Sequence, residues 1–305
     1  MSRRAMILGG FGAVVAGCSS GAGDSPAPTT TAPVPTSSPA PAPDTPEFAE
    51  LEKGFGGRLG VFAMDTGSGA TVGHRADERF LMCSTHKALA AAAVLRLRNE
   101  QPGLLDRVIH YSQSDILEHA PITKQYVAKG MTVSELCQAA LSVSDNTAAN
   151  LLVRTLGGPA SVTAFARSLG DQVTRLDRSE PDLNVTSPGD ERDTTAPAAI
   201  AADLRMLLVG NALDPAGRDL LSGWMTASTT GGDLIRAGLP TGWHTADKTG
   251  SGANGEINDI AVTWPPGRAP LVVAVYTAPT NPKATNGRTT VASATRIAVQ
   301  ALKGS

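Results

Sequence analysis

The sequence lacks the features that define several large classes of protein. Its 26 Lys and Arg residues against 28 Asp and Glu give a net charge of −2, not the basic excess usual in nucleic-acid binders. Three cysteines are too few for a disulfide scaffold. No apolar run reaches the roughly 18–20 residues of a membrane-spanning helix. The hydrophobic content of 41% is nevertheless enough for a folded core.

Spacings typical of metal and nucleotide sites are also missing. The five histidines form no H-x-H or H-x-x-x-H pair and have no clustered carboxylates beside them, so we expect no metal site. Residues 250–255 fit the G-x-G-x-x-G pattern, but a β-rich run follows them where a dinucleotide site needs a helix. We therefore interpret this segment as a hairpin turn and expect no cofactor.

Residues 1–18 have the pattern of an export signal. Arg3 and Arg4 precede a short apolar stretch, Ala5–Ala16, and small residues lead to Cys18. This resembles a bacterial lipoprotein signal, in which the cysteine is lipidated and becomes the mature N-terminus, and loosely a twin-arginine signal. The resemblance implies an exported protein that lipidated Cys18 anchors to the outer face of the cytoplasmic membrane, with a released fraction. The alternative is a buried N-terminal helix that ends in a cysteine.

Proline, of which the chain has 21, is concentrated directly after this segment. Residues 19–46 hold 8 Pro, 5 Thr, 5 Ser and 5 Ala, and therefore lack the apolar side chains that offset the entropy cost of ordering. We expect a disordered tether there, partly in polyproline II conformation. Residues 47–305 have the composition of one globular domain.

The order of periodic segments in that domain predicts its fold. Two strand-like runs, 58–65 and 70–74, come first, and three more, 243–249, 256–264 and 271–276, come near the end. Helical patterns fill the interval between them, and one more helix closes the chain. We expect an α+β fold with a mainly antiparallel five-stranded sheet formed by both chain ends, flanking helices and an inserted all-α subdomain.

The start of an Ala/Leu-rich helix carries a serine and a lysine one turn apart. Ser84, at a helix N-terminus, lies close to unpaired backbone N–H groups, and Lys87 shares its face. A neutral amine there can take the serine proton and make the hydroxyl a nucleophile. The alternative is an N-cap serine beside a surface lysine, because one S-x-x-K match is expected by chance in a chain of this length.

Two further triplets can serve a binding cleft. The Ser-Asp-Asn triplet at 144–146 falls between two helices, where a hydroxyl and an amide can point into a cleft, although all three residue types also favour helix caps. The Lys-Thr-Gly triplet at 248–250 ends a strand. Its glycine would let a substrate lie against the strand edge, and its lysine and threonine could bind a carboxylate. An ordinary strand end is the alternative.

Together, in this order and each occurring once, the three patterns resemble the S-x-x-K, S-D-N and K-T-G motifs of the serine penicillin-recognising enzymes. Ser144 lies 60 residues after Ser84, and Lys248 lies 104 residues after Ser144. The resemblance extends over residues 47–305 and implies a single catalytic domain with its active site between the sheet and the helical subdomain.

A long irregular loop, residues 175–196, distinguishes members of that superfamily. Its Glu180-Pro-Asp-Leu-Asn184 run looks like the E-P-x-L-N of class A β-lactamases. A carboxylate and an amide four residues apart on one helical turn could hold and deprotonate a water beside an acyl-enzyme ester. Transpeptidases of the superfamily lack this glutamate. A solvated loop charge is the alternative.

The class A resemblance implies a role for each catalytic position. Ser84 would attack the β-lactam carbonyl, with the oxyanion between the backbone N–H groups of Ser84 and Ser251. Lys87 would shuttle protons, and either Lys87 or Glu180 would be the acylation base. Ser144, assisted by Lys248, would protonate the departing nitrogen.

The resemblance also implies binding and structural roles. Asn146 would hold the amide of the substrate side chain, Asn184 would position the deacylating water with Glu180, and Thr249 and Ser251 would bind the substrate carboxylate. Three residues would have structural roles: Asp145, and Arg178 with Asp193, which would form an ion pair that closes the loop.

Three positions depart from the class A pattern. Many members carry an arginine on the strand after K-T-G, but residues 256–260 contain no cation. We expect Arg288 to replace it; Arg236 is the second candidate, although a structural role is favoured for it. In some relatives a second cysteine bridges the residue that corresponds to Cys83. The resemblance places Gly252 at the position of that second cysteine, so no disulfide is expected. His119 occupies the place of an aromatic gate, or is a surface histidine.

These features predict a class A serine β-lactamase whose partners are small-molecule β-lactams. It would be a monomer that binds no nucleic acid and meets a membrane only through its lipidated N-terminus. The first alternative is a D-Ala-D-Ala peptidase or transpeptidase of the same superfamily. The second is a lipid-anchored binding protein that uses an inactive enzyme fold.

Overall fold

The structure is a computed structural model that describes residues 43–303. The predicted export signal, Cys18 and most of the predicted tether lie outside these residues. The tether's last residues, by contrast, pack on the folded domain. The Gly73 N–H donates to the Pro43 carbonyl (2.9 Å) and Asp44 Oδ2 lies 2.8 Å from His74 Nδ1. The ordered domain therefore begins at least four residues before the predicted position 47.

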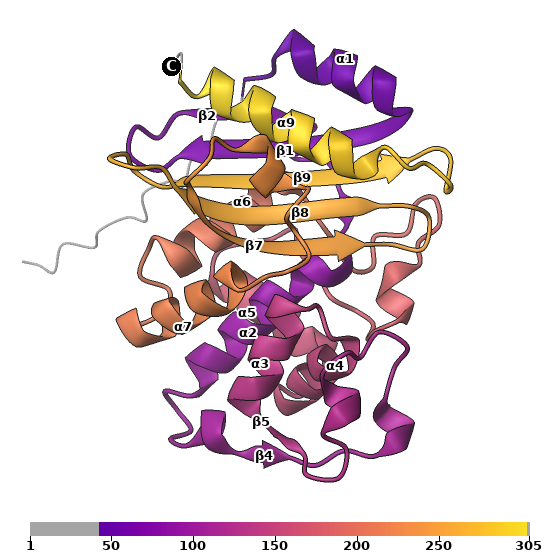
Figure 1. Cartoon of the computed structure of the whole chain (residues 1–305), viewed down its shortest axis with the longest axis vertical. Coiled ribbons are helices and arrows are strands. Elements are labelled where there is room, and N and C mark those ends of the chain that lie inside the picture. The colour runs from indigo at the N-terminus through magenta and orange to yellow at the C-terminus, as the bar shows by residue number, and fades with distance from the viewer. Residues whose placement is uncertain (1–42, 304–305) are drawn as a thin grey trace, which may run out of the picture. The chain divides into compact units, whose positions relative to one another are not determined.

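A five-stranded antiparallel sheet forms the centre of the domain, with the strand order β2-β1-β9-β8-β7 (Figure 1). Its strands are β1 (Gly57–Asp65), β2 (Thr71–His74), β7 (His244–Ser251), β8 (Ile257–Trp264) and β9 (Leu271–Pro279). Two short pairs lie outside it: β3 (Phe80–Leu81) with β6 (Thr194–Thr195), and β4 (Val108–Ile109) with β5 (Met131–Thr132). The first two and the last three strands of the sheet come from opposite ends of the domain, as the sequence predicts.

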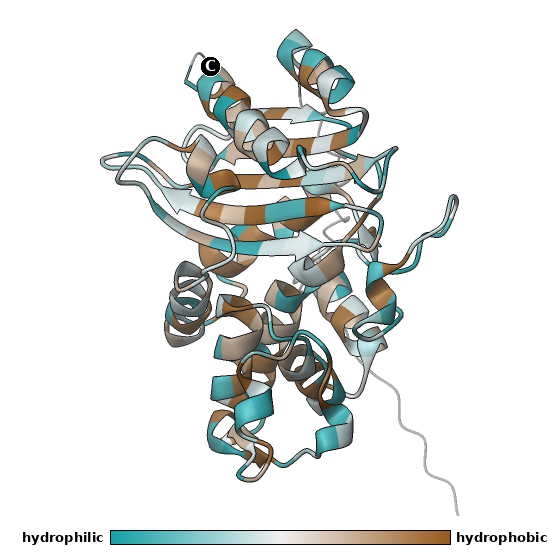
Figure 2. Cartoon of the chain, turned by 45° about the vertical axis from the view of Figure 1, so that its right-hand side comes forward, coloured by the Kyte–Doolittle hydropathy of each residue, from teal (hydrophilic) through white to brown (hydrophobic). Residues whose placement is uncertain are grey.

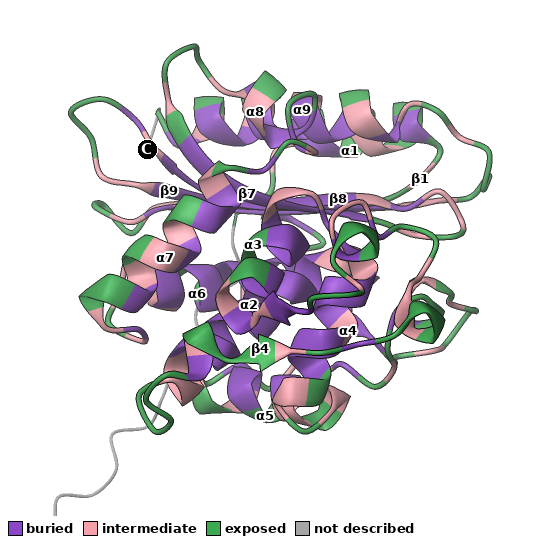
Figure 3. Cartoon of the chain, turned by 60° about the horizontal axis from the view of Figure 1, so that its bottom comes forward, coloured by how far each residue is buried: buried purple, intermediate pink, exposed green. Residues whose placement is uncertain are grey.

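Helices cover both faces of this sheet, and Figure 3 shows α8, α9 and α1 on one side and α2, α6 and α7 on the other. The α-helices are α1 (Pro46–Phe55), α2 (His86–Leu97), α3 (Val133–Ser142), α4 (Asn146–Thr155), α5 (Pro159–Ser168), α6 (Pro197–Leu208), α7 (Pro215–Thr226), α8 (Ile235–Gly238) and α9 (Gly287–Ala301). Single 3-10 turns are η1 (Cys83–Thr85), η2 (Leu104–Asp106), η3 (Gln113–Asp115), η4 (Thr123–Gln125) and η5 (Asp182–Asn184). This is the predicted α+β fold with an all-α subdomain.

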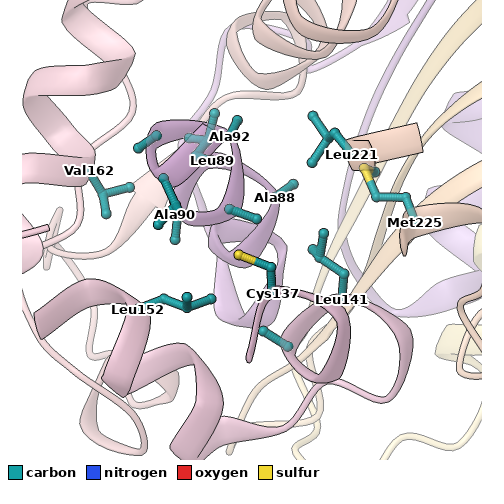
Figure 4. Packing of buried hydrophobic residues seen from close by; sticks show 14 of the residues in the cluster. Ala88, Leu89, Ala90, Ala92, Cys137, Leu141, Leu152, Val162, Leu221 and Met225 are labelled. Atoms are coloured by element: carbon teal, nitrogen blue, oxygen red, sulfur yellow. The ribbon is translucent and has the colours of Figure 1, made fainter. Parts of the chain in front are cut away.

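Two apolar clusters, one on each face of the sheet, hold the layers together. The larger surrounds α2, where every residue from Ala88 to Val94 belongs to the cluster (Figure 4). The smaller lies between the sheet and α1, α8 and α9. Figure 2 shows hydrophobic segments along the strands and hydrophilic segments on the outer loops. An alanine-rich α2 suits its place because small side chains let neighbouring helices approach closely.

Two element boundaries differ from the sequence predictions in informative ways. Helix α1 was not predicted, because only Phe48 and Phe55 of its ten residues are buried and its stability comes from packing on α9 and β1. The Ala/Leu-rich helix was predicted to begin near Ser84, but α2 begins at His86 after the 3-10 turn η1. Cys83 in that turn has φ +48°, so the backbone turns sharply just before the serine.

Candidate active site

A cavity of about 490 Å³ lies where edge strand β7 faces the helical subdomain. Most of the residues predicted to act on substrate line it, together with two threonines from the segment after α7. The lining residues are Ser84, His119, Ser144, Asn146, Asn184, Thr229, Thr230, Thr249, Gly250, Ser251 and Arg288. A larger hollow of about 830 Å³ lies beside residues 186–191 and contains none of the predicted catalytic residues. We therefore take the smaller cavity as the candidate active site.

The turn that carries Ser84 is fixed by hydrogen bonds of its neighbours. The Thr85 hydroxyl lies 2.8 Å from the Met82 carbonyl and 2.9 Å from the Tyr276 hydroxyl. His86 Nδ1 lies 2.8 Å from the Cys83 carbonyl, and burial lowers the pKa of His86 to about 4, so the ring is neutral at physiological pH. The Ser84 hydroxyl donates to Glu180 Oε1 at 3.3 Å. The nucleophile is thus presented on a rigid turn.

Lys87 lies at the centre of the polar groups and is fully buried. Its Nζ donates to the Ser144 carbonyl (2.8 Å), the Ser144 hydroxyl (3.2 Å) and Asn146 Oδ1 (2.6 Å). It also lies 3.1 Å from Glu180 Oε1. Burial lowers the pKa of Lys87, although the Glu180 carboxylate opposes that effect. A lowered pKa makes the neutral amine, the form that can accept a proton, more accessible.

Ser144 connects the two buried lysines. Its Oγ accepts hydrogen bonds from Lys87 Nζ (3.2 Å) and Lys248 Nζ (3.0 Å). Its φ of +59° is unusual for a serine and places it in the tight connection between α3 and α4. Asp145 stabilises that connection by accepting from the backbone N–H groups of Ile122, Thr123 and Ala148. These hydrogen bonds hold the backbone next to Ser144 in place.

Strand β7 brings Lys248 and two hydroxyl residues to the opposite wall. Burial and the nearby Lys87 lower the pKa of Lys248 to about 7. The Gly252 N–H donates to the Glu256 carbonyl on the β8 side (3.0 Å). Because successive N–H groups of a strand point in opposite directions, the Ser251 N–H points away from β8, toward the open edge of the sheet. It is therefore available to an oxyanion in the cavity.

The loop 175–196 carries Glu180 into the site just before the turn η5. The Asn184 side-chain amide donates to Glu180 Oε2 and to the Pro181 carbonyl (3.2 Å). Asn184 Oδ1 is buried and has no partner in the described part of the chain. Burial alone would raise the pKa of Glu180, but the Lys87 cation and the hydrogen bonds from Lys87 and Asn184 together lower the net pKa. Glu180 is therefore a carboxylate at neutral pH.

The predicted ion pair closes the base of this loop. Arg178 Nε lies 2.5 Å from Asp193 Oδ2, and Asp193 Oδ1 accepts from the backbone N–H groups of Asp177 and Arg178. Arg178 Nη2 also donates to the Val185 carbonyl (2.8 Å). Asp193 is fully buried, so the pair contributes a defined loop geometry more than stability.

The remaining predicted binding residues lie around the cavity. Asn146 Nδ2 has no partner in residues 43–303 and is free for a substrate carbonyl. His119 Nε2 lies 3.0 Å from the Val143 carbonyl, at the exposed rim of the cavity. Arg288 lines the cavity, whereas Arg236 pairs with buried Asp247 and donates to carbonyls of the α7 end. Of the two arginine candidates, Arg288 reaches the cavity, whereas Arg236 is engaged by these other contacts.

Cys83 and Gly252 are neighbours in space. A Cβ on Gly252 would lie 3.1 Å from Cys83 Sγ, so the two chain segments touch as the resemblance implies. Cys83 and Cys137 are both buried and free. Burial raises the pKa of both thiols, which makes them poor nucleophiles.

The structure adds residues that the sequence did not single out. Asn150 binds the Glu180 backbone on both sides: its Nδ2 donates to the Glu180 carbonyl (2.9 Å) and its Oδ1 accepts from the Glu180 N–H (3.0 Å). It lies four residues after Asn146 on α4, a helical spacing that could have indicated it. The Thr230 hydroxyl lies 2.8 Å from that of Thr249, and no sequence pattern indicated that contact.

Two negative observations apply to residues 43–303. No group of three or more His, Cys, Asp or Glu side chains there is arranged to hold a metal ion. None of the helices in that range has the length and apolar character of a membrane span.

Comparison with known proteins was consistent across sequence and structure. A family model described as the β-lactamase enzyme family matches residues 45–302. β-Lactamase AST-1 of Nocardia asteroides is 56% identical over 257 residues, which is 84% of this chain and 83% of that protein. β-Lactamase FAR-1 of Nocardia farcinica is 51% identical over 301 residues, 99% of this chain and 96% of that protein. The solved class A β-lactamase from Mycobacterium abscessus is 58% identical, with a TM-score of 0.82 over 84% of this chain and 98% of that one.

Proposed function

Because this chain belongs to the β-lactamase enzyme family and is a class A β-lactamase, we propose that it hydrolyses β-lactams through an ester formed on Ser84. Such hydrolysis confers resistance to β-lactam antibiotics. The observation that carries the mechanism is the convergence of three charged groups on two serines: Lys87, Lys248 and Glu180 all lie within hydrogen-bond distance of Ser84 or Ser144.

Acylation begins at Ser84. Its Oγ bonds to the β-lactam carbonyl carbon while its proton passes to a base, which is Lys87 directly or Glu180. The N–H groups of Ser84 and Ser251 stabilise the oxyanion of the tetrahedral intermediate. The bond between the carbonyl carbon and nitrogen then breaks. The nitrogen takes the proton of the Ser144 hydroxyl, which Lys87 or Lys248 replaces because both donate to its oxygen.

Deacylation uses the opposite side of the site. A water held by Glu180 and the free Asn184 Oδ1 loses a proton to the Glu180 carboxylate and attacks the ester carbon. The ester bond to Ser84 breaks, and Ser84 Oγ takes back the proton that Glu180 accepted from the water, directly or through Lys87, which restores the free enzyme. The Thr249 and Ser251 hydroxyls and the Arg288 cation bind the substrate carboxylate, and Asn146 binds the side-chain amide.

The assignment of Glu180 can be tested by trapping the intermediate. The Glu180→Ala variant keeps the nucleophile but loses the base for deacylation, so penicillin should produce a persistent mass increase equal to one penicillin. The measurement is intact-protein mass spectrometry during incubation with benzylpenicillin. Rapid return of the unmodified mass would overturn the role of Glu180. Asp182→Ala, a matched change two residues along the same loop, should not trap the adduct.

The same experiment separates the alternatives from the main proposal. A D-Ala-D-Ala peptidase would accumulate the adduct in the wild-type protein without turnover, and an inactive binding fold would form none. Glu180 lies beside both Ser84 and Lys87, and this position favours hydrolysis over both the peptidase and the inactive binding fold.

We also propose that the protein is exported and anchored through lipidated Cys18, and that it functions as a monomer. The N-terminal sequence pattern supports the first part, and the match to FAR-1, which extends over 99% of the chain, includes most of that region. A cavity built from residues of one chain supports the second. Light scattering of the released domain tests the monomer.

The lipid anchor has a direct test. Cys18→Ala removes the acceptor sulfur, so the protein should move from the membrane fraction to the soluble fraction while its hydrolysis of nitrocefin is retained. Fractionation with an antibody against the domain measures the distribution. Unchanged membrane association would refute the anchor. The Ser20→Ala variant serves as a control for the substitution itself.

A further inference from the structure

The Arg288 guanidinium at the cavity rim is held by an acidic partner that does not line the cavity. Its Nε donates to Asp233 Oδ2 and its Nη2 donates to Asp233 Oδ1, a two-bond pairing of guanidinium and carboxylate. The same Nη2 donates to the Thr230 carbonyl (3.1 Å). Arg288 Nη1 has no partner in residues 43–303. One edge of the guanidinium is therefore fixed and the other is free.

The fixed edge connects directly to the strand that holds the predicted carboxylate-binding hydroxyls. The Thr230 carbonyl accepts a hydrogen bond from Arg288. The Thr230 hydroxyl lies 2.8 Å from the Thr249 hydroxyl. Arg288, Thr230 and Thr249 all line the cavity, whereas Asp233 is not among its lining residues. The arrangement orders the cation relative to Thr249.

We propose that Asp233 is a positioning and specificity-determining residue that orients Arg288 toward the carboxylate of the β-lactam substrate. The inference rests on the proposed function and names a residue outside the catalytic and binding set. The Arg288 side chain is 43% exposed, so without Asp233 it would sample many rotamers. Because Asp233 holds Arg288 in place before the substrate arrives, substrate binding does not have to pay the entropy cost of ordering that side chain.

The opposing effect of Asp233 is its own negative charge, which repels the substrate anion. The carboxylate is 60% exposed and lies behind the guanidinium, so water screens that repulsion. The geometric contribution acts at contact distance and is not screened in the same way. We therefore expect the loss of Asp233 to weaken binding of anionic substrates rather than to strengthen it.

The test compares KM and kcat for benzylpenicillin and its methyl ester, which lacks the carboxylate. Asp233→Ala should raise KM for benzylpenicillin by about 3–10-fold, from the loss of one ordered long side chain, with kcat within about twofold. It should leave KM for the ester unchanged. Asp233→Asn retains one oxygen that can accept from Arg288, and should restore KM to within about twofold of wild type. In an Arg288→Ala background, Asp233→Ala should add nothing.

The control for this experiment is another carboxylate that pairs with arginines, Glu78. Glu78→Ala removes a carboxylate that is 44% exposed from arginine pairs beside the other hollow and should leave both kinetic constants unchanged. An unchanged or lower KM in Asp233→Ala, an equal change for the ester, or an undiminished change without Arg288 overturns the role of Asp233. If the wild-type enzyme does not open benzylpenicillin at all, the proposed function itself fails.

Discussion

Helix α2 takes part in two buried regions with opposite chemistry. At its N-terminal end, Lys87 contacts a serine hydroxyl, an amide and the Glu180 carboxylate. One residue later the helix enters an entirely apolar region, where Leu89 and its neighbours contact other helices (Figure 4). Both regions are almost completely excluded from water. Burial alone therefore does not distinguish an active site from a core.

The difference lies in what the buried groups contribute. Burial of apolar side chains lowers the free energy of the folded state, so the region around Leu89 stabilises the fold. Burial of charged groups raises the free energy of the folded state because the charges lose their hydration. The contact between Lys87 and Glu180 offsets part of this penalty. The polar region is therefore maintained at a cost to stability, and its benefit is a preorganised set of charges. Substitutions in the two regions should consequently fail in different assays.

The largest effect should follow from removing the charge at the polar end. Lys87→Met keeps the length and apolar stem of the side chain but removes the proton acceptor, so kcat/KM should fall by about 10²–10⁴-fold. Nitrocefin kinetics measure the loss, and circular dichroism checks that the fold is retained. Lys53→Met, at an exposed position on α1, is the control. Retention of more than a tenth of the activity would contradict the assignment.

A change two residues away should act on stability instead. Leu89→Ala opens a cavity in the larger apolar cluster and should cost about 2–5 kcal/mol of unfolding free energy. Denaturant titration measures that loss, and kcat at a temperature where the variant is folded should stay close to wild type. Val108→Ala, at a position that is 45% exposed, should cost less than about 0.5 kcal/mol. Equal costs at the two positions would refute the assigned core.

The smallest effect concerns a buried acid on α6. Burial and the neighbouring Asp171 carboxyl raise the pKa of Asp203 to about 9. The folded state therefore keeps a proton that the unfolded state releases near pH 4. Stability from this group is full below pH 4 and declines as the pH rises toward 9. Asp203→Asn cannot lose that proton, so its Tm should fall less than that of wild type between pH 5 and pH 6, by about 2–4 °C, because one pH unit in this window corresponds to about 1.4 kcal/mol.

Thermal unfolding at the two pH values tests this expectation. Arg167, which lies near Asp171, opposes the raised pKa of Asp203 but does not reverse its direction. Asp219→Asn, at an exposed position on α7, should show the pH dependence of wild type. An Asp203→Asn variant with the same dependence would show that the carboxyl is ionised in the folded state.

Much of the site could be predicted from sequence because its residues occur in short local patterns. Ser84 and Lys87 lie one turn apart, and Glu180 and Asn184 lie on one turn of the loop, so local geometry brings each pair together. The elements were predictable for a similar reason, since α3 has apolar residues at helical spacing and β8 is a short run of residues typical of strands. Helix α1 was missed because its two buried phenylalanines form too weak a pattern.

What the sequence determined by itself was the set of chemical groups: a nucleophile, two lysines, a loop carboxylate and the order of the elements that carry them. Only the tertiary structure decided which of these groups lie within hydrogen-bond distance of one another. Ser144 lies between two lysines 57 and 104 residues away, and Arg288 meets Asp233 55 residues away. Such contacts have no local period. They form only in the folded chain, where β7, the connection between α3 and α4, and the start of α9 line one cavity.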